Sequence, residues 1–261
     1  MLFAGIDVGS VATKVVLMNE TNIYHKTVPT GWSPREAGLD AYHSLLSEAG
    51  CGESQVDFIV GTGYGRIALP FVGKSVTEIT CHARGAVHLV PDSQVVIDVG
   101  GQDSKVIKTN DKGQVLDFAM NDKCAAGTGR FLQVMASALG NDVSELAELA
   151  RDKRPLALNS MCAVFAESEV VGLLANGHDR GEIVAGLHQS IAKRLVTMVQ
   201  RMGTPEKVTF TGGVARNENL RQCLADMLGA QVIVTEQCQL AGAIGAALIA
   251  RDMINKRGER K

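Results

Sequence analysis

Two short segments of the chain share a pattern that is suited to phosphate binding. Residues 6–14 read IDVGSVATK and residues 97–105 read IDVGGQDSK, so Ile, Asp, Val, Gly and Lys recur in one register. In each copy the apolar residues predict a buried strand, which delivers Asp7 or Asp98 to a tight turn without bulky side chains. Backbone N–H groups in such a turn can approach phosphate oxygens while the aspartate faces a cation.

A single Asp-x-Gly pattern is common and is equally compatible with an ordinary hairpin. Its repetition in register indicates an internal duplication and favours a shared function. Two such hairpins facing one another would clamp the phosphates of a nucleotide. The residues expected to bind the nucleotide in these turns are Gly9, Ser10, Val11, Ala12, Thr13, Lys14, Gly100 and Gly101.

Two cysteines, Cys124 in NDKCAAGTGRF and Cys162 in NSMCAVFAESEV, each follow a short polar segment where a helix is expected to begin. Helix N-termini lower the pKa of a thiol and stabilise an anionic metal cluster. A cubane iron–sulfur cluster normally takes four thiolates, so a two-fold dimer would supply the second pair and one cluster would bridge two chains. The same two residues are also compatible with buried free thiols, which are common inside cells.

The other cysteines match no ligand spacing, and we interpret them as packing residues. A chain of this size in a reducing compartment needs no disulfide framework. These residues are Cys51, Cys81, Cys223 and Cys238.

The elements that position these residues are predicted twice over. A strand, a glycine turn and two further strands open each half, and helices follow. The first half has strands 2–8, 13–18, 23–28 and 58–60, with helices from Ser33 to Gly50 and over 78–89. The second has strands 95–99, 104–108, 115–118, 207–210 and 231–234, with helices 125–139, 144–150, 163–174, 182–202 and 217–228; a last helix starts at Ala241.

Two further glycine-rich segments follow later in the chain. In FTGGVARN at 210–217, the paired glycines Gly212 and Gly213 let the backbone lie against a flat nucleoside, and Asn217 opens a helix. LAGAIGAAL at 240–248 is a small-residue helix start that is suited to close packing. Alone, these segments are equally compatible with a helix cap and a helix–helix contact.

Composition excludes several classes of function. The 261 residues carry a net charge of -2 and 46% hydrophobic residues, with no long basic run apart from the tail at 256–261. We therefore expect no nucleic-acid partner. With no apolar stretch of roughly 18 to 20 residues and no signal-peptide pattern, we expect no membrane association and a cytoplasmic location.

The ordered set of motifs resembles the two phosphate motifs, the adenosine motif and the second connecting motif of the actin-like ATPase superfamily. This resemblance implies an α/β chain with two ribonuclease-H-like (actin-like ATPase) domains and ATP in an interdomain cleft. The expected domains are 1–93 with the C-terminal helix 243–261, and 94–242 with the cluster ligands. The resemblance also places Asp7 and Asp98 near a hydrated Mg2+ and Gly212 and Gly213 beside the nucleoside.

GTGYGR at 61–66, IDVGGQDSK, NDKCAAGTGRF and CAVFAESEV closely resemble the activator (component A) of 2-hydroxyacyl-CoA dehydratases, in the family that also contains ATP-binding subunits of benzoyl-CoA reductase. The resemblance implies a homodimer with one bridging 4Fe-4S cluster, in which ATP hydrolysis drives a low-potential electron into a partner dehydratase. Reduced ferredoxin or flavodoxin would be the electron source. Cys124 and Cys162 match the cluster ligands, and Gln239 matches the family's glutamine at the nucleotide.

Hydrolysis of ATP depends on positioning and charge stabilisation. Gln102 and Asp103 follow the second turn and are candidates for orienting the attacking water, a role that Asp98 could equally fill. The acceptor could instead be benzoyl-CoA reductase or a double-cubane-cluster protein. From other classes, a small-molecule kinase using Asp98 or Asp103 as the base, or a nucleotide-dependent switch or filament protein, would use the same fold.

Overall fold

The computed structural model describes residues 1–158 and 162–258. Two compact units make up the chain: Met1–Ser93, Thr109–Leu116 and Thr235–Lys261 form the first, and Gln94–Lys108 and Asp117–Val234 the second. This grouping puts 109–116 and 235–242 with the first unit, whereas the expected boundaries put them in the second domain. Of the predicted motif NSMCAVFAESEV, residues 159–161 lie outside the described part of the chain.

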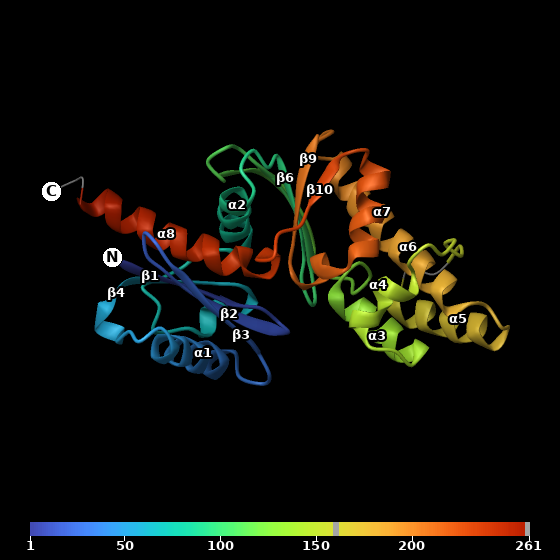
Figure 1. The fold of residues 1–261 in the computed structure, drawn as a ribbon, viewed down its shortest axis with the longest axis horizontal. Coiled ribbons are helices and arrows are strands. Elements are labelled where there is room, and N and C mark those ends of the chain that lie inside the picture. The colour runs from blue at the N-terminus through green and yellow to red at the C-terminus, as the bar shows by residue number, and fades with distance from the viewer. Residues whose placement is uncertain (159–161, 259–261) are drawn as a thin grey trace. The chain divides into compact units, whose positions relative to one another are not determined.

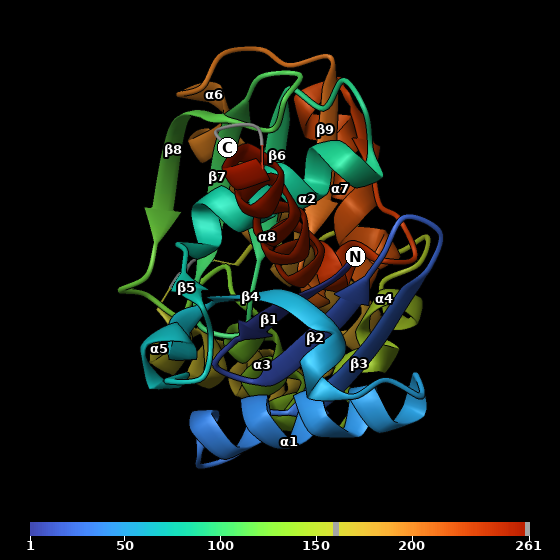
Figure 2. The same ribbon diagram turned by 90° about the vertical axis from the view of Figure 1, so that its left-hand side faces the viewer.

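The first unit is a sheet between helices (Figures 1 and 2). Its strands are β1 (Leu2–Val8), β2 (Ala12–Met18), β3 (Ile23–Pro29), β4 (Val56–Thr62) and β5 (Lys74–Ser75). Its helices are α1 (Pro34–Glu48), α2 (Glu78–Leu89) and α8 (Ala241–Gly258), with short helices η1 (Glu53–Gln55), η2 (Tyr64–Ala68) and η5 (Cys238–Leu240). The strand order is β3-β2-β1-β4-β5. Helix α1 covers one face, and α8 covers the other with α2 packed against it.

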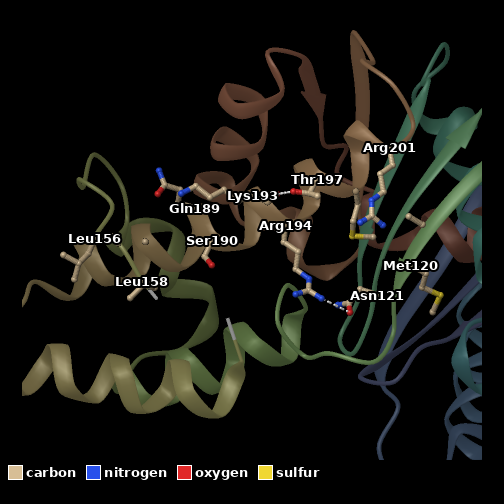
Figure 3. Close-up of a pocket in the computed structure, with 14 residues that line it drawn as sticks. Met120, Asn121, Leu156, Leu158, Gln189, Ser190, Lys193, Arg194, Thr197 and Arg201 are labelled. Carbon is tan, nitrogen blue, oxygen red and sulfur yellow. Dashed lines mark hydrogen bonds between the residues drawn. The ribbon is translucent and has the colours of Figure 1, made fainter. Parts of the chain in front are cut away.

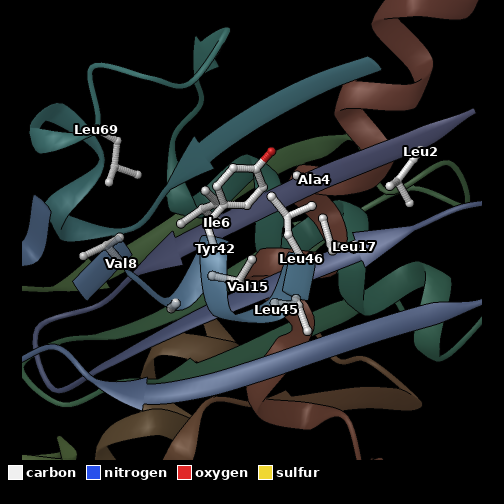
Figure 4. Close-up of a cluster of buried hydrophobic side chains, with 11 residues drawn as sticks. Leu2, Ala4, Ile6, Val8, Val15, Leu17, Tyr42, Leu45, Leu46 and Leu69 are labelled. Carbon is white, nitrogen blue, oxygen red and sulfur yellow. The ribbon is translucent and has the colours of Figure 1, made fainter. Parts of the chain in front are cut away.

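The core of this unit follows from alternation along β1. Leu2, Ala4, Ile6 and Val8 point to the α1 side and pack with leucines and Tyr42 of that helix (Figure 4). Every residue of β1 is buried, because the opposite face is covered as well. Burying one large apolar side chain contributes about 1.5–3 kcal/mol, so this cluster fixes the strand that ends at the first phosphate loop.

Glycines allow α8 to approach the sheet and α2 at backbone distance. A Cβ at Gly5 would lie 2.0 Å from the carbonyl oxygen of Ala243, and one at Gly245 would lie 1.8 Å from that of Cys81. The predicted close packing of the small-residue segment at 240–248 is therefore confirmed.

The second unit repeats the arrangement with additional helices. Its strands are β6 (Val95–Val99), β7 (Ser104–Thr109), β8 (Val115–Asn121), β9 (Lys207–Thr211) and β10 (Gln231–Ile233). Its helices are α3 (Gly129–Leu139), α4 (Leu146–Leu149), α5 (Ala163–Ala175), α6 (Arg180–Gln200) and α7 (Glu218–Leu228), with η3 (Val143–Glu145) and η4 (Gly213–Arg216). The strand order is β10-β9-β6-β7-β8.

Both sheets have the same pairing around their central strand. β1 pairs antiparallel with β2 and parallel with β4, and β6 pairs antiparallel with β7 and parallel with β9. The internal duplication and the two-unit α/β fold are thus confirmed. None of the helices among the described residues has the length and apolarity that crossing a membrane requires.

One predicted helix start is wrong. The helix expected from residue 125 begins at Gly129, with Thr128 as its N-cap in extended conformation. Gly127 has a φ of +86°, which turns the chain before the helix can start. Cys124 therefore lies in a loop ahead of the helix, not at its first turn.

Candidate functional site

The first phosphate loop is a tight turn at the end of β1. Asp7 lies opposite Lys14 in the β1–β2 register, and Lys14 Nζ is 3.1 Å from Asp7 Oδ2. The N–H of Gly9 donates to the carbonyl of Ala12 at 3.1 Å and closes the turn. The positive charge of Lys14 therefore compensates the negative charge of the buried Asp7.

Thr30, which directly follows β3, donates to two carbonyl oxygens of this loop. Its hydroxyl donates to the Gly9 carbonyl at 2.7 Å, and its N–H donates to the Val11 carbonyl at 3.0 Å. No described hydrogen bond uses the N–H groups of Ser10 and Val11, which suits a loop whose donors are reserved for an anion. Thr13 is buried and its hydroxyl bonds that of Thr30, so its side chain is engaged within the protein.

The second loop has the same construction with a different support. Lys105 Nζ lies 3.4 Å from Asp98 Oδ2 and 2.8 Å from Asp103 Oδ2, and the Gly100 N–H donates to the Asp103 carbonyl at 3.0 Å. Here the loop's carbonyls accept from the first turn of α3. The Gly129 N–H donates to Gly100 O at 2.9 Å, and the Arg130 N–H donates to Gly101 O at 2.8 Å. The second loop and the start of α3 are therefore one hydrogen-bonded unit.

The three candidates for orienting a water differ in setting. Gln102 is exposed at the turn, whereas Asp103 is half-buried and held by Lys105. Asp98 is buried and accepts a hydrogen bond from the Thr211 hydroxyl at 3.1 Å. Gln102 is thus the side chain of this group that is most open to solvent.

We expect Lys105→Met to lower the free energy of unfolding by about 3–5 kcal/mol, because it leaves Asp98 and Asp103 without their shared buried cation. Lys14→Met is the matched control, since Lys14 occupies the same register position but its side chain is 14% exposed, against 4% for Lys105. Urea unfolding at neutral pH measures both. Equal losses in the two variants would contradict this assignment.

Two threonines that the sequence analysis did not identify lie beside the two aspartates. Thr62 lies beside Asp7 across β1–β4, and Thr211 lies beside Asp98 across β6–β9. The glycine that follows each threonine has a positive φ, +86° at Gly63 and +89° at Gly212. The repeated Thr-Gly after a buried strand was the signal that could have revealed both.

These glycines lie against the aspartates. A Cβ at Gly63 would lie 2.4 Å from Asp7 Oδ1, and one at Gly212 would lie 2.9 Å from Asp98 Oδ1 and 2.3 Å from the Val99 carbonyl. A side chain at either position would therefore displace the carboxylate or its strand.

The remaining predicted nucleotide residues occupy separate places. Gly213 is exposed at the start of η4, whereas Asn217 caps α7, accepting from the Leu220 N–H at 2.9 Å. Gln239 is half-buried in η5, just before α8. At the first turn of α8, a Cβ at Gly242 would lie 2.8 Å from Asp7 Oδ2. Gln239 is thus close in sequence to a backbone segment that meets Asp7.

Asn217 belongs to a buried polar network that includes a histidine. His188 Nε2 is 3.0 Å from Asn217 Nδ2, and His188 Nδ1 is 2.8 Å from Asn219 Oδ1. Asn219 in turn donates to the Ala150 carbonyl at 3.3 Å. The neutral imidazole matches both partners, donating from Nδ1 and accepting at Nε2. The network thereby ties α6 to the segment that follows Gly212.

Burial lowers the pKa of His188 from its ordinary 6.5 to about 4. Between these two pH values, His188 therefore binds a proton in the unfolded chain but not in the native chain. The contribution of His188 to the free energy of unfolding is fully present above pH 6.5. It decreases by about 3 kcal/mol as the pH drops toward 4. We expect His188→Gln to remove this slope, so the unfolding free energies of variant and parent should converge on acidification. A difference that stays constant with pH would contradict the prediction.

The two candidate ligand cysteines differ in exposure. Cys162 is exposed and is the N-cap residue of α5, as predicted, whereas Cys124 is half-buried in its loop. Helices α3 and α5, which follow the two cysteines, pack against each other. Among the described residues, no group of three or more His, Cys, Asp or Glu side chains could hold a metal ion.

The loop of Cys124 is held from one side by two residues that the sequence did not indicate. Asn121 donates to the Cys124 carbonyl at 2.8 Å and to the Ala126 carbonyl at 3.3 Å. Arg194 of α6 donates to Asn121 Oδ1 at 3.1 Å, and a Cβ at Gly127 would lie 3.2 Å from the Arg194 side chain. Arg194 and Asn121 therefore fix the path of the chain around Cys124.

Three of the other cysteines are wholly or partly buried. Cys81 and Cys238 are buried, and burial raises the pKa of Cys81 to about 12. Cys223 is partly buried in α7, and burial raises its pKa as well. These settings suit packing and do not favour metal ligation.

Comparison with known proteins identifies the family. The BadF/BadG/BcrA/BcrD ATPase family matches residues 4–250. The chain is 42% identical to the activator of lactoyl-CoA dehydratase from Anaerotignum propionicum, over 98% of this chain and all of that one. It matches the crystal structure of component A of (R)-2-hydroxyglutaryl-CoA dehydratase from Acidaminococcus fermentans with a TM-score of 0.93 and 40% identity, covering 98% of this chain and 99% of that one.

A second solved structure is that of the activator of 2-hydroxyisocaproyl-CoA dehydratase from Clostridium difficile with bound ADPNP. It matches with a TM-score of 0.93 and 39% identity over 100% of this chain and 98% of that one. The resemblance found in the motifs is confirmed along the whole chain, and the chain belongs to the BadF/BadG/BcrA/BcrD ATPase family.

Proposed function

We propose that the protein is an ATP-dependent one-electron donor that activates a 2-hydroxyacyl-CoA dehydratase-type iron–sulfur protein. The observation that carries this proposal is the hydrogen bonding of the Gly100–Gly101 loop to the first turn of α3, because the loop of Cys124 leads directly into that turn. A displacement of the phosphate loop is thereby passed to the backbone next to a candidate cluster ligand. The activators among the relatives support the same assignment.

Nucleotide binding rests on the two phosphate loops. In this proposal the free N–H groups of Ser10 and Val11, and their counterparts in the second loop, contact phosphate oxygens. Asp7 and Asp98 face a hydrated Mg2+, and Gln102 orients the attacking water. The glycines at 63 and 212 fit this role, since a Cβ there would reach the carboxylates. Binding of ADPNP by the C. difficile relative supports nucleotide binding by this chain.

In this proposal each chain supplies half of a four-thiolate set. Cys162 is exposed at the N-terminus of α5, where its sulfur is open to a ligand. A 4Fe-4S cluster would supply low-potential one-electron transfer when bound. Cys124 and Cys162 would hold it together with the same residues of a second chain.

The exposed apolar side chains of α5 support a homodimer. Only Ala166 and Val170 are buried in this helix, whereas Val164, Phe165 and Val171 are 69%, 67% and 53% exposed. An apolar helix surface that begins at Cys162 suits a contact with a second copy of itself across a two-fold axis.

Anaerobic purification tests the proposal. We expect a brown dimer with about four irons per two chains. With reduced ferredoxin or flavodoxin, it should reduce a dehydratase of the kind that the relatives activate, and only while it hydrolyses ATP. A colourless monomer that hydrolyses ATP, or electron transfer at the same rate without ATP, would contradict it.

A further inference from the structure

A cavity of about 570 Å³ lies within the second unit along α6 (Figure 3). Residues of α6 form one wall, and the end of β8 from Ala119 to Asn121 and the segment Leu156–Leu158 form the others. Its volume falls in the range of roughly 300–1,000 Å³ that is usual for small-molecule sites.

The charge of this cavity has one sign. Lys193, Arg194 and Arg201 line it, and the described lining residues include no carboxylate. Lys193 and Arg201 make no ion pair with a described residue, and Arg194 bonds only the neutral amide of Asn121. Because the whole chain carries a net charge of -2, this concentration of cations is local. Such a site favours an anion.

The spacing of the cations indicates the shape of the ligand. Ser190, Arg194, Thr197 and Arg201 recur every three or four residues and so form one stripe along the helix. Seven residues of helical rise separate the two arginine backbones by about 10 Å. Met120 and Met198 also line the cavity, together with Leu156 and Leu158. An elongated molecule with an anionic group at each end and an apolar middle complements this lining.

A ligand in the cavity would affect the loop of Cys124. The Arg194 guanidinium donates to Asn121 Oδ1, and Asn121 donates to the Cys124 carbonyl. A charged oxygen is a stronger acceptor than a neutral amide oxygen, so an anion in the cavity competes with Asn121 for Arg194.

We propose that this cavity binds a small organic dianion between Arg194 and Arg201, and that binding loosens the hold of Arg194 and Asn121 on the loop of Cys124. The binding site stands independently of electron transfer. Its consequence for a cluster rests on the function proposed above.

The test uses the complete protein saturated with ADP and Mg2+, so that the phosphate loops are occupied. Suberate is the probe, because its two carboxylates lie at the ends of an apolar chain; octanoate, with one carboxylate, and pyrophosphate, with no apolar part, are the comparisons. Calorimetry should show saturable suberate binding that weakens about tenfold or more in Lys193→Gln/Arg201→Gln, where charge-assisted bonds are lost. Lys74→Gln, an exposed lysine of the first unit, should bind as the parent does.

Octanoate or pyrophosphate binding as tightly as suberate, or unchanged suberate affinity in the double variant, would overturn the proposed site. Hydrogen exchange of the amides at 121–130 tests the coupling and should increase with suberate, and without ligand in Arg194→Gln. Unchanged exchange on suberate binding would overturn the coupling. Because neither measurement needs iron, a failure of the electron-donor assignment would leave both results interpretable.

Discussion

Replacing Cys124 or Cys162 with serine is expected to remove iron from the protein while nucleotide binding persists. Each substitution deletes two thiolates from a set of four in a two-fold dimer, which leaves too few ligands for a cubane cluster. Neither residue lies in a phosphate loop, and the hydrogen bonds of the Cys124 loop use backbone carbonyls and not the thiol. Iron content after anaerobic purification and the affinity for ADP, measured on the same sample, separate the two effects.

Cys223→Ser is the matched control for this experiment. Its thiol is partly buried on α7, and burial raises its pKa, so the parent and the control should hold the same iron. Full iron retention in Cys124→Ser and Cys162→Ser would exclude these residues as ligands. Loss of iron together with loss of ADP binding would instead indicate collapse of the second unit.

The second large effect is expected from Gly212→Ala. Its Cβ would lie 2.3 Å from the Val99 carbonyl and 2.9 Å from Asp98 Oδ1, so the strand end and the aspartate must move. We expect kcat/KM for ATP hydrolysis to fall at least tenfold, because positioning supplies most of the catalysis in phosphoryl transfer. Stability should also fall by about 1–3 kcal/mol from overpacking, in addition to the strain of the positive φ.

Gly203→Ala controls for backbone strain. Gly203 has a φ of +112°, yet a Cβ there would meet no atom within 4 Å. The control should lose stability and keep its kcat/KM. Equal losses of kcat/KM in the two variants would show that close approach to Asp98 is irrelevant to hydrolysis.

Much of this fold can be predicted from the sequence, because the patterns that specify it are local. The repeated Ile-Asp-Val-Gly with a lysine five residues later predicts two buried hairpins, and both are found with Asp7 opposite Lys14 and Asp98 opposite Lys105. Proline and serine at 33–34 predict the start of α1, and Ser33 caps it. These features depend on neighbouring residues and on the period of a strand or helix.

The supports of the site could not be predicted, because they join residues that are distant in the chain. Arg194 meets Asn121 across 73 positions, and Thr211 meets Asp98 across 113. Nothing near either residue signals its partner. The predicted start of α3 is wrong for a different reason. Small residues at 125–129 are compatible with both helix and loop, and the positive φ of Gly127 decides in favour of the loop.

The packing of α8 against β1 has a consequence for biosynthesis. β1 ends at the first phosphate loop, yet the helix that covers its face is made only after residue 240, and Gly5 meets Ala243 at backbone distance. During synthesis, the residues up to the end of the second unit leave the ribosome before α8 does. At that stage the face of the first sheet that contains Phe3 is therefore uncovered and accessible to chaperones. The scaffold of the first phosphate loop is therefore complete only after the residues of α8 have been made.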